Sequence, residues 1–335
     1  MRILVGVVLA LFIAWSGYWV VGQRAIKGQI GTILARDLPE GMTFEQTHYS
    51  VAGFPNRFDL NVTAPRYHDA LTGWGWSADF AQVFAMTWKP WHLIAALPHD
   101  QQIATPFGPV DLLSQRFVAS LRVAPSIEVS FEEAVLEVEA ARLTAAFLPP
   151  ITVDKLVVAL KQEPAQGPAY RLGVQAANLT PLIAQATGGN LTTGQLDVVF
   201  YTTVPLDRNL GAPNTEPQSA EQGLVELTGL DLRRLSLDWG PVTVSGSGRL
   251  VRISEGFAEG EIALKVSGWR DLAARLADFG LLRPEIAPTI SVALDLIAKE
   301  QGYPAILDLP LRFKSGRSYL GPLPLGLAPM LAQRQ

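Results

Sequence analysis

Residues 239–282 read WGPVTVSGSGRLVRISEGFAEGEIALKVSGWRDLAARLADFGLL, and this stretch decides the fold. Apolar residues recur at every second position on both sides of Gly240-Pro241, and again from Ile262 to Val266. A period of two is typical of strands with one apolar face, and the turn residues between the runs indicate strand–turn–strand units. From Trp269 to Leu282 the apolar spacing changes to three and four residues, which predicts a helix that follows the hairpins.

The same alternation continues outward over most of the chain. Runs with a period of two occur at residues 58–64, 76–88, 117–123, 196–204 and 307–313. Helical spacing returns at Ile290–Lys299, and a third helix is expected around Leu179–Ala186. The sequence therefore predicts a mainly β protein: an extended, curved antiparallel sheet with two or three short helices.

Composition limits the kinds of protein that this chain can be. Hydrophobic residues make up 48% of its 335 residues and charged residues 17%, which excludes a disordered chain. A net charge of −4 argues against a protein that covers nucleic-acid phosphates. The absence of cysteine excludes disulfides, thiolate metal sites and a cysteine nucleophile.

The N-terminus carries a segment with the length of a membrane span. Residues 3–22 contain no charge, and 20 residues of helix extend about 30 Å, the thickness of the hydrocarbon core. Trp15, Tyr18 and Trp19 lie near its C-terminal end, where an interfacial aromatic belt is expected. We interpret residues 1–22 as an uncleaved anchor. The alternative is a cleaved signal peptide, although Ala14-Trp15-Ser16 is a poor cleavage site.

The rest of the chain divides by its composition. Residues 23–39 have helical apolar spacing and predict an amphipathic stem helix. Residues 40–206 form a first β-rich region, and the polar stretch 207–222 is expected to be a linker or surface loop. Residues 223–335 form a second β-rich region with two helices. It ends in an apolar tail rich in Pro and Gly, which we expect to lie over a sheet edge or face.

A signature follows the stem. Residues 53–60, Gly53-Phe54-Pro55-Asn56-Arg57-Phe58-Asp59-Leu60, resemble the G-[FY]-P-x-R-[FL]-D-L signature of a membrane-anchored alphaproteobacterial family of unknown function. Pro98, Thr105-Pro106 and the closing 321–326 segment resemble other landmarks of that family.

More remotely, residues 239–282 are similar to the hairpin-plus-helix segments of AsmA-like envelope proteins. This resemblance implies one N-terminal anchor, a curved sheet and a part in lipid homeostasis or transport between membranes. It also implies that the N-terminal helix is anchored in the bacterial inner membrane and that the rest of the chain lies in the periplasm. The positive charges at Arg24, Lys27 and Arg36 mildly oppose that orientation.

A search for chemistry in the sequence finds no catalytic, cofactor-binding or metal-binding motif. There is no phosphate-binding loop, and the four histidines have no zinc spacing. Arg57 and Asp59 of the signature would share one face of a strand, either as a structural ion pair or as a contact for a lipid head group. We therefore expect a protein that is not an enzyme and needs no cofactor.

Two hypotheses about function remain open. In the first, one apolar face of the sheet is a groove for acyl chains, with a phospholipid as the ligand. In the second, the chain is a scaffolding subunit of an envelope complex, with a protein partner and no ligand. Both include the bilayer, contacted through residues 3–22, as a partner, and neither includes nucleic acid. The candidate lipid-facing residues are Phe58, Leu60, Trp76, Phe80, Phe84 and Trp88.

Overall fold

The computed structural model describes residues 1–34, 38, 41–164, 167–180, 189–208, 225–321 and 323–331. It confirms the expected fold class, because most of these residues belong to one antiparallel sheet. The helices are α1 (Arg2–Leu34), η1 (Trp269–Asp271), α2 (Leu272–Asp278), η2 (Pro284–Ile286) and α3 (Ala287–Glu300). The chain forms two compact units, which are described one at a time.

Unit 1 comprises Met1–Arg122 and Arg142–Phe147, and its strands form two antiparallel rows. The first row is β2 (His48–Ala52), β3 (Arg57–Thr63), β6 (Phe80–Met86), β7 (Lys89–Ala96) and β10 (Arg116–Val123). The second row is β1 (Met42–Glu45), β4 (Arg66–Asp69), β5 (Trp74–Ala78), β8 (Asp100–Thr105) and β9 (Gly108–Leu113), and it continues onto the end of β11 (Phe131–Ala145).

The two rows are joined by short breaks in otherwise continuous strands. One break is Ala64-Pro65 between β3 and β4, where Ala64 has a φ of 48°. Another is Asp79 between β5 and β6, and Pro98 lies in a third between β7 and β8. Proline interrupts a hydrogen-bonded ladder because it has no N–H donor. Each of these long segments therefore contributes one strand to each row.

Unit 2 comprises Val123–Ala141 and Leu148–Gln335. Each of its long strands pairs with the next strand in the sequence. They are β12 (Leu148–Gln162), β13 (Ala169–Leu179), β14 (Leu191–Thr202), β15 (Leu227–Trp239), β16 (Val242–Arg252), β17 (Ala258–Ser267), β18 (Ile306–Lys314), β19 (Arg317–Leu320) and β20 (Leu323–Leu327).

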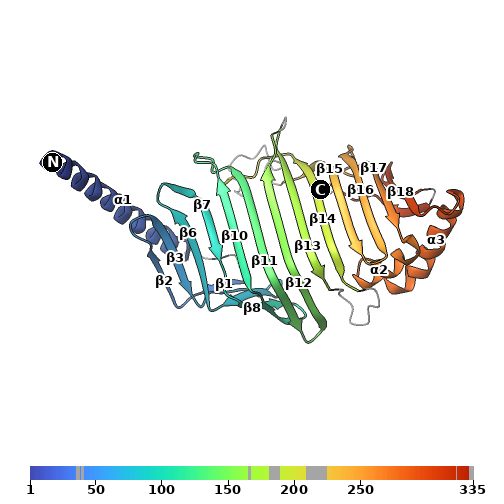
Figure 1. The fold of residues 1–335 in the computed structure, drawn as a ribbon, viewed down its shortest axis with the longest axis horizontal. Helices are drawn as coiled ribbons and strands as arrows, with labels where there is room; N and C mark the ends of the chain where they lie inside the picture. Colours follow the sequence, from blue (N-terminus) through green and yellow to red (C-terminus); the bar gives the residue numbers. More distant parts are fainter. Residues whose placement is uncertain are drawn as a thin grey trace. The chain divides into compact units, whose positions relative to one another are not determined.

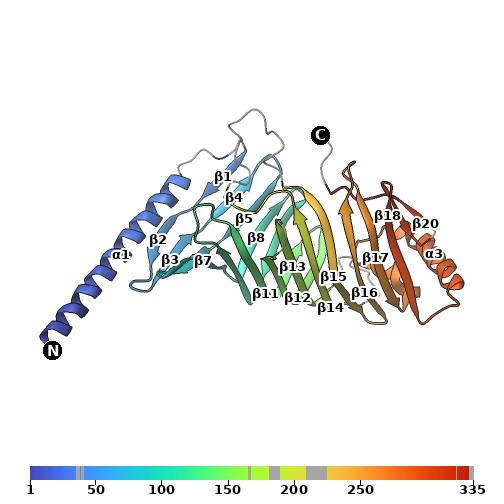
Figure 2. The ribbon, with the colours of Figure 1, turned by 90° about the horizontal axis from the view of Figure 1, so that it is seen from above.

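The main core of unit 2 lies where α2 and α3 cover β15–β18 (Figures 1 and 2). Leu294 of α3 and Leu272 of α2 pack in one cluster with Trp239, Val266 and Leu309 of the strands. These helices are short, so their stability depends on burying one apolar side against the sheet. A smaller cluster lies at the other end of β16 and β18, where the C-terminal segment packs on them through Ala328.

The sequence located the helices but not every strand. A helical segment begins at Trp269 and another runs over Ala287–Glu300, as predicted. Residues 76–88 are not one strand, because Asp79 separates β5 from β6 and Trp88 lies in the turn after β6. In the apolar tail, β20 pairs only with β19 among the described strands.

Two further sequence predictions fall mainly on residues outside the described part of the chain. These are the linker at 207–222, of which only 207 and 208 are described, and the helix around Leu179–Ala186. Leu179 itself ends strand β13, and the other described residue of that segment, Thr180, follows it outside any helix.

A core substitution in α3 should destabilise unit 2. Leu294→Ala should lower the free energy of unfolding by about 2–5 kcal/mol, because Leu294 is fully buried in the main core. Leu296→Ala is the matched control; Leu296 is exposed, so its loss should stay within about 0.5 kcal/mol. Urea unfolding of the full chain in detergent, followed by tryptophan fluorescence, measures both. Equal losses would show that α3 does not pack as described.

Candidate functional site

One face of the first row of unit 1 is apolar across all five strands. Residues directly opposite each other in an antiparallel pair share a face. One line of such partners is Val51, Leu60, Val83, Ala95 and Ala119. The neighbouring line is Phe58, Ala85, Leu93 and Leu121. These nine residues define the apolar face of unit 1.

This face is covered at one end and open at the other. Trp19, Val20 and Ile26 of α1 pack on its first two strands, where Phe58 is 5% exposed. Along the same line of partners, Leu93 is 36% exposed and Leu121 is 37% exposed. The apolar surface therefore begins under α1 and becomes exposed toward β7 and β10.

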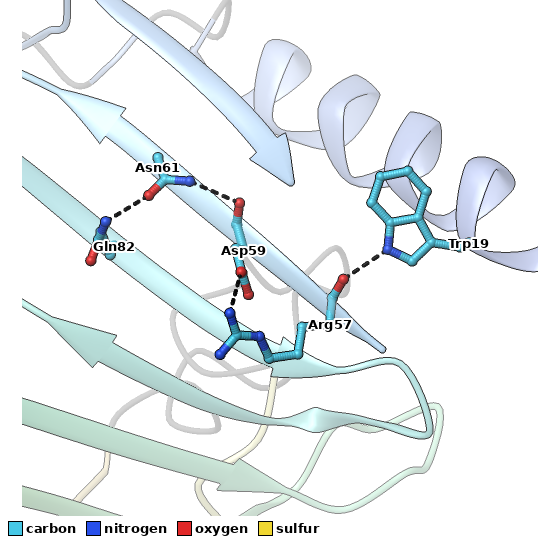
Figure 3. A network of polar contacts seen from close by, with 5 residues as sticks. All are labelled: Trp19, Arg57, Asp59, Asn61 and Gln82. Carbon is cyan, nitrogen blue, oxygen red and sulfur yellow. Dashed lines mark hydrogen bonds and ion pairs between the residues drawn. The ribbon is translucent and has the colours of Figure 1, made fainter. Parts of the chain in front are cut away.

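Helix α1 is fixed to the sheet by hydrogen bonds from its side chains to backbone carbonyls. The indole Nε1 of Trp15 donates to the Pro55 oxygen at 2.9 Å, and that of Trp19 to the Arg57 oxygen at 2.8 Å. Figure 3 shows the second of these contacts. The Tyr18 hydroxyl donates to the Thr87 oxygen at 2.7 Å, and the Gln23 amide to the Val51 oxygen at 2.8 Å. Carbonyls of β2, of β3 and of the connections next to β3 and β6 are thus paired with the helix.

Close packing accompanies these bonds. The Trp19 ring lies edge-on to Phe54, with centroids 5.4 Å apart, and stacks on Phe58 at 6.1 Å. Gly22 is needed where the helix crosses Phe58, because a Cβ at Gly22 would lie 2.6 Å from that ring. The aromatic residues that the sequence suggested as an interfacial belt therefore also hold the anchor against the body.

The signature shapes the loop that α1 contacts. Gly53 has a φ of 97°, and a Cβ there would lie 2.8 Å from the Arg57 carbonyl oxygen. That carbon would also be 2.9 Å from the Asp59 carboxyl carbon, so both the backbone and the space require glycine. The Arg57 amide donates to the Gly53 carbonyl at 2.9 Å and closes the turn before β3. The Phe54–Pro55 peptide bond within this turn is cis.

Polar side chains of the signature lie on the opposite face of β3. The Arg57 guanidinium donates to Asp59 at 2.9 Å and lies 5.7 Å from the centre of the Phe84 ring. The Asn61 side chain donates to the Asp59 carbonyl at 3.2 Å and accepts a bond from Gln82 at 2.8 Å (Figure 3). This confirms that Arg57 and Asp59 share a face. Asp59 is buried while Arg57 is half exposed, so the pair is only partly solvated.

The six candidate lipid-facing residues do not share one face, and the single-face interpretation was wrong. Phe58 and Leu60 lie on the apolar face of unit 1. Phe84 is opposite Asp59 and Phe80 is opposite Thr63, so both lie on the other face. Trp76 belongs to the second row, and Trp88 lies in the turn between β6 and β7. Continuous alternation from 76 to 88 concealed the break at Asp79.

The sequence analysis missed the residues that extend the apolar face. Val83, Ala85, Leu93 and Ala95 were hidden because small or aliphatic residues occur on both faces of β6 and β7. Composition could not separate the two faces. The signal that finds them is the register between strands, starting from Phe58 and Leu60 of the signature.

A second apolar face runs across unit 2. One line of partners is Leu160, Leu172, Val198, Leu232, Gly248, Ile262, Leu311 and Leu320. The next is Val158, Val174, Leu196, Leu235, Gly246, Leu264 and Leu309. These two lines define the apolar face of unit 2. Helices α2 and α3 cover it near β18, whereas Leu172 and Val174 of β13 are only partly buried by the described residues.

The other face of the same strands is charged. Arg171 forms two hydrogen bonds with the Asp197 carboxylate, at 2.7 and 2.6 Å, and this holds the pKa of Asp197 below its usual value. The pair therefore stabilises the fold above the ordinary carboxyl pKa, and the stabilisation is lost as the pH falls through the lowered pKa. Further cross-strand pairs are Arg233 with Glu163 and Arg312 with Glu261. One face of unit 2 is thus polar and the other apolar.

Among the described residues, no group of three or more His, Asp or Glu side chains could hold a metal ion. The strongest organised features are therefore the two apolar faces and the junction with α1. Helix α1 is long and apolar enough to cross a membrane over Arg2–Thr32, with 6% of its most apolar window buried in the protein.

Residues 19–329 match the model of a family described as "Uncharacterized protein conserved in bacteria (DUF2125)". The chain belongs to this family. The match begins at Trp19, so it includes the contacts of Trp19 and Gln23 with the sheet, the signature and the second unit, whereas Trp15 and Tyr18 precede it. It confirms the expectation of a bacterial family of unknown function. The comparison with curated proteins gave no match, and neither did the comparison with solved structures.

Removing Phe58 should weaken the junction with α1. Phe58→Ala should lower the free energy of unfolding by about 3–5 kcal/mol, because its ring is buried beneath Trp19 and Gly22. Phe84→Ala, on the opposite face of the adjacent strand, is the matched control and should cost less because Phe84 is only partly buried. Thermal unfolding of the full chain in detergent shows which of the two variants loses more stability. A larger loss for Phe84→Ala would contradict the assigned faces.

Proposed function

We propose that this protein binds the acyl chains of phospholipids on its apolar sheet faces and assists lipid transfer or envelope homeostasis without catalysing a reaction. In this proposal α1 crosses the bacterial inner membrane once and the body lies in the periplasm. The observation that carries the proposal is the apolar face of unit 1. It starts under the anchor helix at Phe58 and becomes exposed at Leu93 and Leu121.

The chemistry of that face suits an acyl chain better than a polar ligand. Every one of its nine residues is aliphatic or aromatic, and none carries a polar side chain. A buried acyl chain gains about 0.8 kcal/mol per CH₂ group, so ten carbons would supply about 8 kcal/mol before ordering costs. A lipid held this way would survive purification.

Unit 2 offers a second surface with the same chemistry. Its apolar face carries no charged residue along two lines of partners, while the polar face of the same strands carries ion pairs. Val198 and Leu232 of this face are buried, whereas Leu172 and Val174 of β13 stay partly accessible. An apolar patch that stays accessible generally marks a binding site. The resemblance of residues 239–282 to AsmA-like envelope proteins also supports the proposal, because it implies a part in lipid homeostasis or transport.

Lipid contact can be measured with matched neighbours on one strand. A photoreactive benzoylphenylalanine at Ala95 should cross-link to phospholipid in cells, because Ala95 lies on the apolar face of unit 1. The same residue at Ala96 should not, because Ala96 is opposite Gln82 on the other face. In unit 2, Ala176 on the apolar face should cross-link, whereas Ala177, opposite Lys155, should not. Mass spectrometry of the purified adducts identifies the lipid.

The outcomes separate the two hypotheses. Lipid adducts at Ala95 and Ala176 alone support lipid binding. Protein adducts at these two positions, with no lipid in an organic extract of the purified chain, would replace it with the scaffolding role. Equal adducts at all four positions would show that the faces do not discriminate.

The orientation is tested by reporters fused after Gln335. With the body in the periplasm, an alkaline phosphatase fusion is active and a green fluorescent protein fusion is dark. The Lys and Arg residues after the span make this a demanding test, because they favour the cytoplasm. A bright fluorescent fusion without phosphatase activity would reverse the assigned side.

A further inference from the structure

The charges around α1 fix where a bilayer could lie on it. Residues 3–22 carry no charge, Arg2 precedes them, and Arg24 and Lys27 follow. A span centred on this segment has its midpoint next to Phe12. At a rise of 1.5 Å per residue, Trp15 lies about 4 Å from the centre and Trp19 about 10 Å. The hydrocarbon core reaches about 15 Å from its centre, so both tryptophans lie inside it.

Parts of unit 1 touch α1 at these depths. The Phe54 ring packs edge-on against Phe12, with centroids 6.4 Å apart. The Pro55 carbonyl accepts a bond from Trp15, and the Thr87 carbonyl accepts one from Tyr18. These residues belong to two neighbouring connections, one before β3 and one after β6. A helix that spans the bilayer over residues 3–22 cannot leave these connections in water.

We propose that this end of unit 1 is inserted in the leaflet on the body's side, with its acyl chains as the binding partner. The inserted part, here called the membrane tip, comprises Phe54, Pro55, Met86, Thr87 and Trp88. The inference depends on α1 spanning the bilayer, as the proposed function also states. It does not depend on lipid binding at Ala95.

The exposed side chains of the membrane tip suit hydrocarbon. Phe54 is 48% exposed, Trp88 is 56% exposed and Met86, at the end of β6, is 41% exposed. None of the five residues is ionisable. The ionisable residues Arg57 and Lys89 lie directly opposite Met86 on β3 and β7, so they set the limit of insertion. Arg57 lies level with Trp19, from where a long side chain can reach the head groups.

The backbone of the membrane tip is also suited to a site without water. Unpaired backbone groups are costly in hydrocarbon. The carbonyls of Pro55 and Thr87 accept bonds from α1, and the Asn56 carbonyl accepts from both the amide and the hydroxyl of Thr87, at 3.0 and 3.1 Å. The Thr87 side chain is fully buried. The loops thus have internal or helix partners for these carbonyls and present aromatic rings outward.

Insertion would connect the membrane to the apolar face of unit 1. Ala85 directly precedes Met86 of the tip, and its line of partners continues to Leu93 and Leu121, which are exposed. An acyl chain that leaves the leaflet beside the tip would therefore meet an apolar surface at once. This specifies the source of the lipid in the proposed function as the anchoring leaflet.

The absence of cysteine allows a direct measurement of depth. Single-cysteine variants Phe54→Cys and Trp88→Cys of the full chain are labelled with the fluorophore NBD and reconstituted in vesicles of phosphatidylethanolamine and phosphatidylglycerol. Phe107→Cys is the matched control, an aromatic residue 79% exposed in the turn between β8 and β9 of the same unit. Emission is quenched from inside the membrane by doxyl-labelled phosphatidylcholine and from the water by iodide.

The inference predicts that doxyl lipids quench the labels at 54 and 88 at least about twofold more than the label at 107, since the quenchers are confined to the hydrocarbon core. Iodide should show the opposite order. Iodide quenching of 54 and 88 equal to that of 107, with no effect of doxyl lipids, would overturn the inference. Trp88 is 56% exposed, and among the described residues no hydrogen bond or ring contact joins it to α1, so its variant decides the outcome if Phe54→Cys fails to fold.

The quenching and cross-linking experiments together distinguish the two proposals. If iodide reaches the tip and lipid adducts form at Ala95, the lipid-binding proposal is supported and the insertion proposal is contradicted. If doxyl lipids quench the labels at 54 and 88 and no lipid adducts form at Ala95 or Ala176, insertion is supported and acyl binding on the sheet faces is contradicted.

Discussion

Cross-strand register is the constraint on which this structure depends. Side chains alternate along each strand, so pairing Phe58 with Ala85 rather than Phe84 determines every residue that shares its face. A slip of one position would place Asp59 and Asn61 under α1. The glycine-dependent turn at Gly53 and the fit of Phe58 against Gly22 oppose that slip. The signature therefore sets the register of the first row and, through it, the composition of both faces.

Edge strands of sheets are hazards because their free backbone groups can pair with other chains. In unit 1 the exposed edge of β2 lies beside α1, and the Gln23 side chain bonds to the Val51 carbonyl. In unit 2 the short strand β20 ends the sheet, and Pro324 within it lacks a donor. The two units therefore protect their outer edges by different means, one with a helix and one with proline.

Much of the fold followed from the sequence because period-two runs and turn residues are local signals. The helices at Trp269 and Ala287 and the strands around Gly240-Pro241 needed no distant information. The break at Asp79 was missed because apolar residues occupy even-numbered positions both before and after it. The run from 76 to 88 therefore looked like one continuous strand. The junction with α1 was missed for another reason. Trp15 and Trp19 had a sufficient explanation as interfacial residues, and nothing local indicates that a carbonyl more than thirty residues away accepts from them.

The neighbour-to-neighbour pairing of unit 2 has a consequence for how the chain acquires its structure. From β13 to β17 each strand bonds to the one made just before it, so none of these strands must wait for a partner from a distant part of the sequence. Contacts that are close in sequence close small loops and form quickly. A chain that emerges from its N-terminal end could add one strand at a time to a growing edge. In that order, α2 and α3 follow β17 and can cover β15–β17, and β18 then completes the core beneath them.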